Sequence, residues 1–220
     1  DKTRKPGTAP TPPEIVAQVI EKTCQPPPSE ATHWTGRAMA KAMLGRWPSG
    51  HFATIYGTVI AGQHPDTGRP FAMVEPQMGG WGATPDRPGT GPLFSSSHGD
   101  TFNCPVEIAE ARYGLEVVEK SLVLATQTPG DHAGGPGVKT RYRMRGPAKL
   151  SAGLSHGKEP VWSQNGAPPS DCNTLTIRCR DGAHYRESFV SGLNIDAGDE
   201  VEIQTASGGR FKNLDGTSDQ

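Results

Sequence analysis

Residues 73–110 read MVEPQMGGWGATPDRPGTGPLFSSSHGDTFNCPVEIAE, and this stretch decides how the rest of the chain is interpreted. Its glycines flank Trp81 in a run of about twenty residues that has neither helical nor strand periodicity. Glycines in such a run are typical of backbone that needs a positive φ or a very close approach by another group. A loop of this length in a compact domain is usually functional or an ordered binding loop. The alternative is a packed turn in which Trp81 fills a core position.

The end of the same stretch supplies three candidate catalytic residues, Asn103, Glu107 and Glu110. A spacing of three residues places the two carboxylates on one face of a short helix. Paired carboxylates can act as general acid and base when a shared low-dielectric site separates their pKa values. The alternative is a pair of solvated carboxylates near a helix start. Asn103 is either a ligand or a turn or helix cap before Pro105.

The composition limits the class of protein. The 220 residues are enough for one ordinary domain or two small ones. Only 33% are hydrophobic, while Gly 28 and Pro 21 predict a loop-rich structure. The formal net charge of −1 gives no excess of positive charge for nucleic acid or for an acidic membrane surface. No apolar run is long enough to predict a membrane span. Small molecules or proteins are the expected partners.

The cysteines and histidines show no metal-ligand spacing. Cys24, Cys104, Cys172 and Cys179 form no CxxC pair, so we expect reduced thiols and a cytoplasmic protein. The seven histidines contain no HxH or HxxxH pair. The sequence therefore predicts no metal site in this chain.

The N-terminal part predicts a helical appendage over residues 13–46. Residues 1–12 are charged and rich in proline and glycine, and we expect them to be disordered. Apolar residues recur at helical spacing from Ile15 to Cys24, where three prolines follow. A second helix is expected over residues 37–44.

Beyond this appendage the chain predicts short strands separated by turns. The first two strands are joined by the turn HPDTGRP and should form a hairpin. A short helix is expected over residues 106–113. Strands are expected over residues 52–60, 71–75, 117–126, 138–144, 175–180, 184–190 and 201–205. The fold class is therefore α+β: a β-dominated mixed domain with long Gly-rich loops over residues 47–209, preceded by a short two-helix segment and followed by a disordered tail over residues 210–220.

Five sequence blocks, taken in order, resemble the hydantoinase B/oxoprolinase family over about residues 39–209. The blocks are GGWGA (79–83), NCPVE (103–107) with Glu110, GGPG (134–137), RGPAKLSAG (145–153) and NIDAGDEVEIQTASGG (194–209). Ordered agreement of five blocks is more specific than any single block. The family includes subunits of ATP-dependent N-methylhydantoinases and 5-oxoprolinases, and of the related acetone and acetophenone carboxylases.

The resemblance implies the C-terminal portion of a larger subunit, whose N-terminal half carries a metal motif that this chain lacks. It implies a hydantoinase A-type partner subunit that handles ATP, and a cyclic amide or a ketone as substrate. No cofactor is expected in this chain, whereas ATP and a divalent metal are implied for the full complex. The family blocks further imply a substrate or interface loop made of Gly79, Gly80, Trp81, Gly82, Ala83, Gly134, Gly135 and Gly137.

Two positions depart from the family pattern. Ala133 stands where the family generally has an arginine before the Gly-Gly pair, which removes a cation that could bind a carboxylate or carbonyl oxygen. Near the end, Gly208-Gly209 leads into Arg210-Phe211-Lys212 in place of an aromatic residue and a further glycine.

Residues 11–43 resemble the helix-turn-helix region of insertion-sequence transposases of the DDE type. Their cations, Arg37 and Lys41 with Arg46 just beyond, are few for neutralising DNA phosphates. The sequence thus leaves four functions open: a subunit fragment for ATP-dependent hydrolysis of a cyclic amide (hydantoin or 5-oxoproline), an acetone or acetophenone carboxylase-type fragment, a noncatalytic truncated or fused chain, and DNA binding through residues 13–46.

Overall fold

A computed structural model describes residues 13–23, 48–53, 56–95, 98, 101–128 and 131–213. The chain divides into two units, Asp1–Trp47 and Pro48–Gln220. In the first unit, α1 (Pro13–Thr23) confirms the first expected helix. Pro13 suits the first helical position because its missing N–H has no partner there, and Glu14 complements the positive end of the helix dipole. The expected disordered residues 1–12 and the second helix at 37–44 lie outside the described residues.

A four-stranded antiparallel sheet forms one layer of the second unit, in the order β11-β8-β1-β2. Its strands are β1 (Tyr56–Gln63), β2 (Pro70–Pro76), β8 (Ala148–Leu154) and β11 (Phe189–Ile195). The expected hairpin is confirmed, since β1 and β2 pair directly. Its turn closes through a 2.8 Å bond from His64 N to Arg69 O, and Gly68 has the positive φ of 66° that favours glycine.

A five-stranded antiparallel sheet forms the other layer, in the order β10-β9-β12-β7-β5. Its strands are β5 (Leu115–Val123), β7 (Gly137–Met144), β9 (Thr174–Arg178), β10 (His184–Glu187) and β12 (Glu200–Gln204). A turn with Gly182 at φ 92° joins β9 to β10. The short helix α3 (Val106–Arg112) packs against β5.

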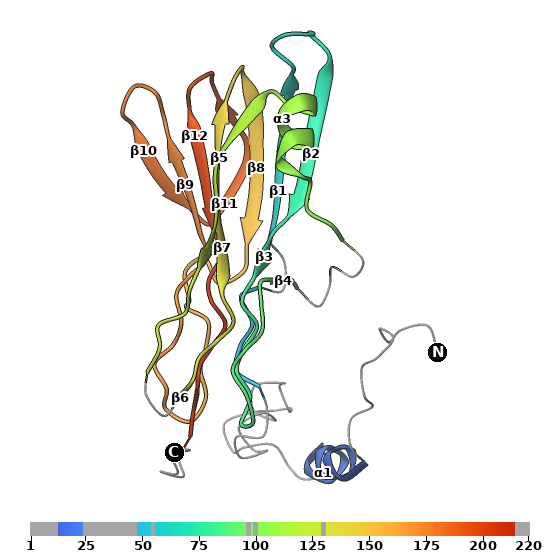
Figure 1. Ribbon diagram of the computed structural model, residues 1–220, viewed down its shortest axis with the longest axis vertical. Coiled ribbons are helices and arrows are strands. Elements are labelled where there is room, and N and C mark those ends of the chain that lie inside the picture. The colour runs from blue at the N-terminus through green and yellow to red at the C-terminus, as the bar shows by residue number, and fades with distance from the viewer. Residues whose placement is uncertain are drawn as a thin grey trace. The chain divides into compact units, whose positions relative to one another are not determined.

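The two sheets pack face to face and enclose one hydrophobic core (Figure 1). Alternate residues of each strand point inward, as the period of two requires. Ile60 and Leu150 come from one sheet, and Tyr142, Ile177 and Ile203 come from the other; all five side chains are at most 2% exposed. The second unit is therefore a β-sandwich, which confirms the β-dominated fold class.

Two pairs of very short strands lie beyond the ends of the long strands (Figure 1). They are β3 (Met78–Gly79) with β4 (Leu93–Phe94), and β6 (Asp131–His132) with β13 (Phe211–Lys212). The tail expected to be disordered from residue 210 is therefore ordered at its start, because Phe211 is only 4% exposed and pairs with His132. Residues 214–220 lie outside the described residues.

The prediction of a single strand over residues 184–190 was wrong. The run at 184–190 is two strands, since β10 belongs to the five-stranded sheet and β11 to the four-stranded sheet. The chain crosses between the layers at Ser188, whose carbonyl accepts a bond from Leu154 N at 3.1 Å. The strand expected at 52–60 begins later, at Tyr56. In the part of the chain that the structure describes, no helix is both long and apolar enough to cross a membrane.

Candidate functional site

Six chain segments meet through backbone hydrogen bonds beyond the strands, and we call them the glycine bundle. They are residues 49–52, 79–83, 89–91, 133–137, 161–164 and 205–210. The last segment bonds to several of the others: Gly80 N donates to Ala206 O at 3.1 Å, and Gly208 N donates to Gly135 O at 2.9 Å. Segments far apart in sequence are thus joined backbone to backbone.

The glycines of the bundle are required by close approach. A Cβ atom on Gly80 would lie closer than 3.0 Å to backbone atoms of Gly135 and Gly208, and one on Gly208 would collide with the carbonyl of Trp81. Neither Gly80 nor Gly208 has a positive φ. Of the two explanations that the sequence left open for these glycines, steric contact therefore holds here.

Trp81 fixes the centre of this bundle. Its backbone N donates to Thr90 O and its carbonyl accepts from Gly135 N, both at 2.9 Å. The indole is half-buried, and Nε1 donates to Phe94 O at 3.1 Å. The ring of His51 lies 5.8 Å away, centroid to centroid. The structure thus gives the half-buried indole a hydrogen-bond partner, and Trp81 lies outside the hydrophobic core cluster, so it does not fill the core position that the packed-turn alternative assumed.

The residues predicted as a substrate or interface loop come together in this bundle. Gly79 and Ala83 are the first and last residues of the segment 79–83, and Gly134 and Gly137 lie in the segment 133–137. Ala83 is fully buried, and its N–H donates to Gly209 O at 2.9 Å. The geometry gives these residues a packing role, and their contact with a substrate or partner stays a prediction.

A buried polar cluster inside the sandwich surrounds the carboxylate of Glu75, which is 4% exposed. Tyr142 donates its hydroxyl to Oε2 at 2.5 Å, and Asn103 donates Nδ2 to Oε1 at 2.8 Å. Lys120 Nζ lies 3.6 Å from Oε1. Burial raises the pKa of Tyr142 well above its ordinary value, and the nearby charge of Glu75 adds to this. The phenol therefore stays protonated and remains a donor.

Two buried polar atoms of this region have no hydrogen-bond partner among the described residues, namely Thr58 Oγ1 and Asn103 Oδ1. Thr58 is fully buried and faces Glu75 directly across the β1–β2 ladder. Cross-strand neighbours have Cβ atoms about 5 Å apart. The cluster is therefore a polar interior with hydrogen-bonding capacity to spare.

The three candidate catalytic residues are placed differently from one another. Asn103 belongs to the Glu75 cluster, and it also approaches Pro76 O at 3.4 Å. Glu110 Oε1 accepts a 2.8 Å bond from Val117 N, which ties α3 to the start of β5. Glu107 is exposed on α3. The structure thus shows bonding roles for two of them and a solvent-exposed carboxylate for the third.

Sequence reasoning missed Glu75 and Tyr142. The signal was present for Glu75: it shares strand parity with buried Met73, so an inward carboxylate could have been read from the alternation. Tyr142 likewise shares strand parity with buried Met144, and both side chains lie on the inward face of β7. Their meeting across two sheets had no signal in the sequence.

Asn173 was also missed, and it joins the bundle to the sandwich. It is 1% exposed and uses its whole amide. Nδ2 donates to Phe52 O at 2.7 Å and to Ser155 O at 2.6 Å, while Oδ1 accepts from Ala206 N at 2.7 Å. Its own N–H donates to the carbonyl of His156, which has a positive φ of 54°. An isolated asparagine before a strand gives no sequence signal for such a role.

His51 lies beside this junction and next to Trp81. Its Nδ1 is buried without a hydrogen-bond partner among the described residues. Burial lowers the pKa of His51; a backbone hydrogen bond acts in the opposite direction, and the charge of His156 adds a smaller downward effect. Burial thus favours the neutral imidazole.

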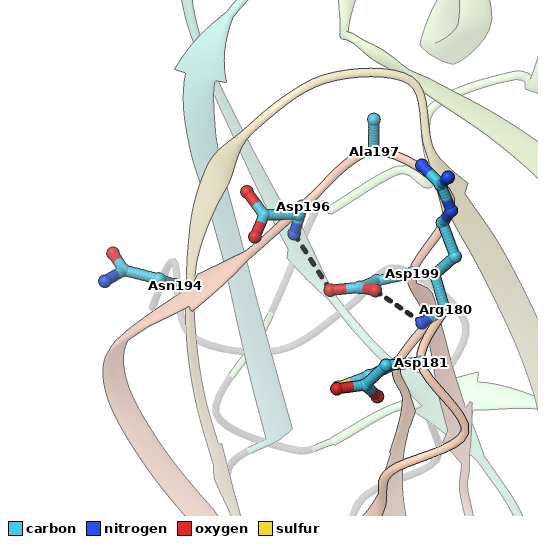
Figure 2. Close-up of a pocket in the computed structure, with 7 residues that line it drawn as sticks. Arg180, Asp181, Asn194, Asp196, Ala197 and Asp199 are labelled. Atoms are coloured by element: carbon cyan, nitrogen blue, oxygen red, sulfur yellow. Dashed lines mark hydrogen bonds between the residues drawn. The ribbon is translucent and has the colours of Figure 1, made fainter.

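A surface hollow of about 420 Å³ lies at the far ends of β9, β11 and β12 and is lined by three aspartates (Figure 2). The carboxylate of Asp199 is already occupied, because Oδ1 accepts from Arg180 N at 2.8 Å and Oδ2 from Asp196 N at 2.9 Å. In the described ranges, no three His, Cys, Asp or Glu side chains group as a metal would require. The residues that line this hollow therefore do not fit the divalent metal that the family resemblance implies for a full complex.

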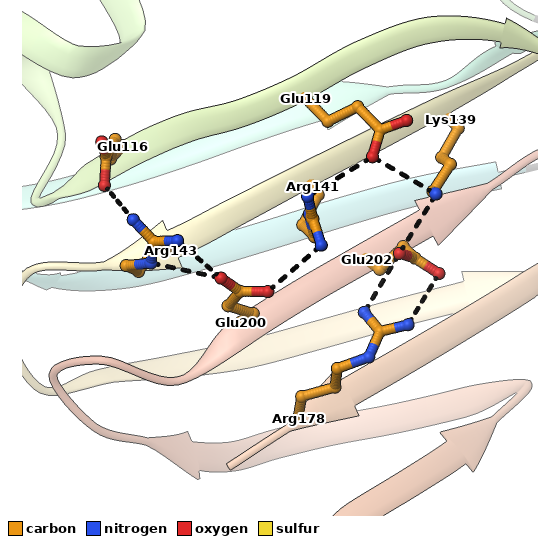
Figure 3. A network of polar contacts seen from close by, with 8 residues as sticks. All are labelled: Glu116, Glu119, Lys139, Arg141, Arg143, Arg178, Glu200 and Glu202. Atoms are coloured by element: carbon orange, nitrogen blue, oxygen red, sulfur yellow. Dashed lines mark hydrogen bonds and ion pairs between the residues drawn. The ribbon is translucent and has the colours of Figure 1, made fainter. Parts of the chain in front are cut away.

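The outer face of the five-stranded sheet carries a ladder of alternating charges (Figure 3). Its members are Glu116, Glu119, Lys139, Arg141, Arg143, Arg178, Glu200 and Glu202. Four acids face four bases across β5, β7, β12 and β9. The network is self-neutralising, so it offers no basic surface to nucleic acid. The described cysteines, Cys104, Cys172 and Cys179, are free thiols, as expected.

The fold and the bundle define a β-sandwich module whose end is packed through glycine backbone. The chain belongs to the hydantoinase B/oxoprolinase family, because the sequence model of that family matches residues 9–212. The match begins well before residue 39, so it includes the segment that resembled a transposase. That transposase resemblance finds no support.

Two solved structures have a similar fold. The crystal structure of ATP-dependent caprolactamase from Pseudomonas jessenii superposes with a TM-score of 0.62 at 18% identity, over 80% of this chain and 32% of that chain. A nucleotide-free structure of acetone carboxylase gives a TM-score of 0.53 at 11% identity, over 80% of this chain and 28% of that chain. At these identities the likeness shows the fold.

Among curated proteins, the chain is 29% identical over 110 residues to the uncharacterized protein MJ0963 of Methanocaldococcus jannaschii. The aligned part is 50% of this chain and 19% of that protein. The chain thus spans a third or less of the length of each of these three proteins.

Proposed function

We propose that this chain is the C-terminal region of a hydantoinase B/oxoprolinase-type subunit and serves the ATP-dependent opening of a cyclic amide together with a hydantoinase A-type subunit. The observation that carries the proposal is the family match over residues 9–212. The similarity to a caprolactamase, which is named as ATP-dependent and acts on a cyclic amide, supports the same reaction class. The cytoplasm is the compartment that supplies ATP to such a complex.

The chemistry follows from the stability of the amide. Phosphorylation of the amide oxygen by ATP on the partner subunit turns that oxygen into a good leaving group. Water then attacks the activated carbon, the C–N bond breaks as the ring nitrogen takes up a proton, and the carbon is left as an acyl phosphate. A second water hydrolyses the acyl phosphate, so that ATP, the amide and two waters become ADP, phosphate and a ring-opened amino acid. Binding energy used to hold this activated intermediate raises the rate of the second step.

This chain contributes a rigid frame to that process. The GGWGA segment and the Gly134–Gly137 segment are held by backbone bonds on both sides, such as Gly135 N to Trp81 O at 2.9 Å. A rigid backbone of this kind holds a substrate or a partner surface without a further ordering cost. We assign the bundle as the substrate or interface loop, and exposed Glu107 on α3 as the remaining candidate for proton transfer.

The second candidate is a carboxylase-type subunit fragment that acts on a ketone. The similarity to acetone carboxylase favours it, with a lower TM-score of 0.53 against 0.62 for the caprolactamase. In that reaction the activated group is an enol oxygen, and bicarbonate replaces water as the co-substrate. The two proposals therefore differ in the substrate that ATP activates, which is a cyclic amide in the first and a ketone in the second.

The test is reconstitution with an A-type subunit. The complex is assayed for ATP hydrolysis with 5-oxoproline, hydantoin, caprolactam, or acetone plus bicarbonate, and the ring-opened or carboxylated product is measured. We expect product with one cyclic amide, in equal amount to the ADP formed. Product from acetone alone would transfer the assignment to the carboxylase type. Normal folding and complex formation without turnover would leave a noncatalytic chain.

A further inference from the structure

Taken as whole residues, five lysines and arginines are half-buried in the described part of the chain: Lys139, Arg141, Arg143, Arg178 and Arg210. The first four all belong to the charged ladder and have carboxylate partners within 4.0 Å. Arg210 differs, because no described carboxylate lies within 4.0 Å of its guanidinium. A charge that is partly withdrawn from water is costly unless a counter-charge compensates it.

The backbone of Arg210 is rigidly held. Its N–H donates to Ser163 Oγ at 2.9 Å, and its carbonyl accepts from Ser49 Oγ at 2.6 Å and from Gln164 N at 2.9 Å. Among the described residues, the side chain makes one hydrogen bond, from Nη1 to Thr128 Oγ1 at 3.2 Å. A guanidinium has five N–H donors, so most of its capacity is unused.

The residue opposite Arg210 on the neighbouring segment is small. The β6–β13 ladder pairs Phe211 with His132, and the same register continued by one residue places Arg210 opposite Ala133. The bond from Gly208 N to Gly135 O shows that the pairing continues. The opposing residue therefore presents only a methyl group, and glycines follow on both segments. A cation thus stands opposite the position where the family pattern would have placed one.

We propose that Arg210 forms an oxyanion-binding site that accepts a carboxylate or phosphate group of a small ligand. The planar fork of a guanidinium matches both groups in bidentate geometry. Thr128 accepts a bond from the guanidinium through Oγ1, so its own hydroxyl proton is free to donate to the same oxyanion. The rigid backbone presets the position of the fork, which lowers the ordering cost of binding.

Asp131 is the alternative partner within the chain. It lies directly opposite Lys212 in the ladder and on the same face as Arg210, two residues away along the strand. No ion pair joins its carboxylate to the guanidinium of Arg210, so the two groups are more than 4.0 Å apart. The experiment therefore includes a variant at this position.

The test measures binding to the full chain by calorimetry, with the side-chain Nε–Hε signal of Arg210 followed by NMR. The probes are inorganic phosphate, 5-oxoproline, and 2-pyrrolidinone, which has the same ring without the carboxylate. The choice of 5-oxoproline rests on the proposed function, whereas the phosphate probe does not. Phosphate alone would identify a phosphate site, and 5-oxoproline without 2-pyrrolidinone would identify a carboxylate site.

Arg210→Gln is expected to weaken binding of the recognised anion about 10- to 100-fold, the effect of losing charge-assisted hydrogen bonds. Arg210→Lys should retain part of the affinity, and Arg87→Gln, at an exposed arginine, should leave it unchanged. Binding of either anion that Arg210→Gln leaves within twofold would overturn the proposal, as would a lack of saturable binding of both anions. A tenfold gain in Asp131→Asn would also overturn it, since Asp131 would then be the native partner.

These measurements need neither ATP nor an A-type subunit. Anion binding that depends on Arg210, without turnover in the reconstituted complex, would retire the proposed function and keep the site. Turnover that Arg210→Gln leaves intact, without anion binding, would retire the site and keep the function.

Discussion

The buried Glu75 cluster makes a quantitative prediction about Tyr142→Phe. The substitution keeps the aromatic ring and removes the hydroxyl that donates to Glu75 at 2.5 Å. Glu75 is 4% exposed, so water cannot replace the lost donor without disturbing the core. The carboxylate would retain Asn103 as a hydrogen-bond donor and Lys120 as a counter-charge.

The magnitude follows from the charge of the acceptor. A hydrogen bond to a charged group contributes about 1.5–3 kcal/mol, against about 0.5–1.5 kcal/mol for a bond between neutral groups. Tyr56 provides the matched control, because it is equally buried and donates to the neutral carbonyl of Thr174 at 3.0 Å. We therefore expect Tyr142→Phe to lower the free energy of unfolding by about 1 kcal/mol more than Tyr56→Phe does.

The assay is urea unfolding at neutral pH. The unfolding free energies of the two variants are compared once their m-values are shown to agree. An equal or smaller loss in Tyr142→Phe would refute the reasoning, since it would mean that Glu75 is not a charged acceptor in a dry interior.

The same pair predicts an alkaline limit to stability. Burial raises the pKa of Tyr56 and of Tyr142 above the ordinary value of 10.0, and for Tyr142 the charge of Glu75 adds to the effect. Above that pH the unfolded chain releases these protons while the folded chain retains them. The stabilisation is therefore complete below pH 10 and is lost as the pH rises further, by about 1.4 kcal/mol per pH unit for each tyrosine. Each Phe variant should remove its share of the slope.

Three further outcomes are expected. Gly80→Ala places a Cβ against backbone atoms that cannot move independently, so it should lower the unfolding free energy by about 3 kcal/mol or abolish folding. Gly57→Ala has open space around its Cβ and should change the unfolding free energy by less than about 1 kcal/mol in the same urea titration. Asn173→Ala leaves buried carbonyls and an N–H unpaired and should cost about 3–5 kcal/mol, while Asn194→Ala, at an exposed position, should stay within about 0.5 kcal/mol. Burial acts to raise the pKa of Glu202, but Arg178 and the neighbouring cations outweigh it and lower that pKa; Glu202→Gln should therefore be less stable than wild type at neutral pH, with the difference vanishing as acid protonates the wild-type carboxylate.

Local sequence patterns determined the elements of this fold. The first helix, the β1–β2 hairpin with its HPDTGRP turn, and the strand β7 follow from periodicity and turn chemistry, because those signals depend on residues close together in the chain. The run at 184–190 misled for the same reason. Its β-rich composition is continuous, and only the packing of two layers places β10 and β11 in different sheets.

The sequence likewise determined the family and marked the glycines as unusual, since a run of glycines around Trp81 is visible without any structure. Only the tertiary structure decided what those glycines do. Gly80, Gly135 and Gly208 are far apart in the chain, and their shared requirement is a steric one between backbones that meet after folding. The Glu75 cluster and Arg210 depend on the same kind of long-range meeting, because burial and partnership of a charge are properties of neighbours in space, which a local pattern does not encode.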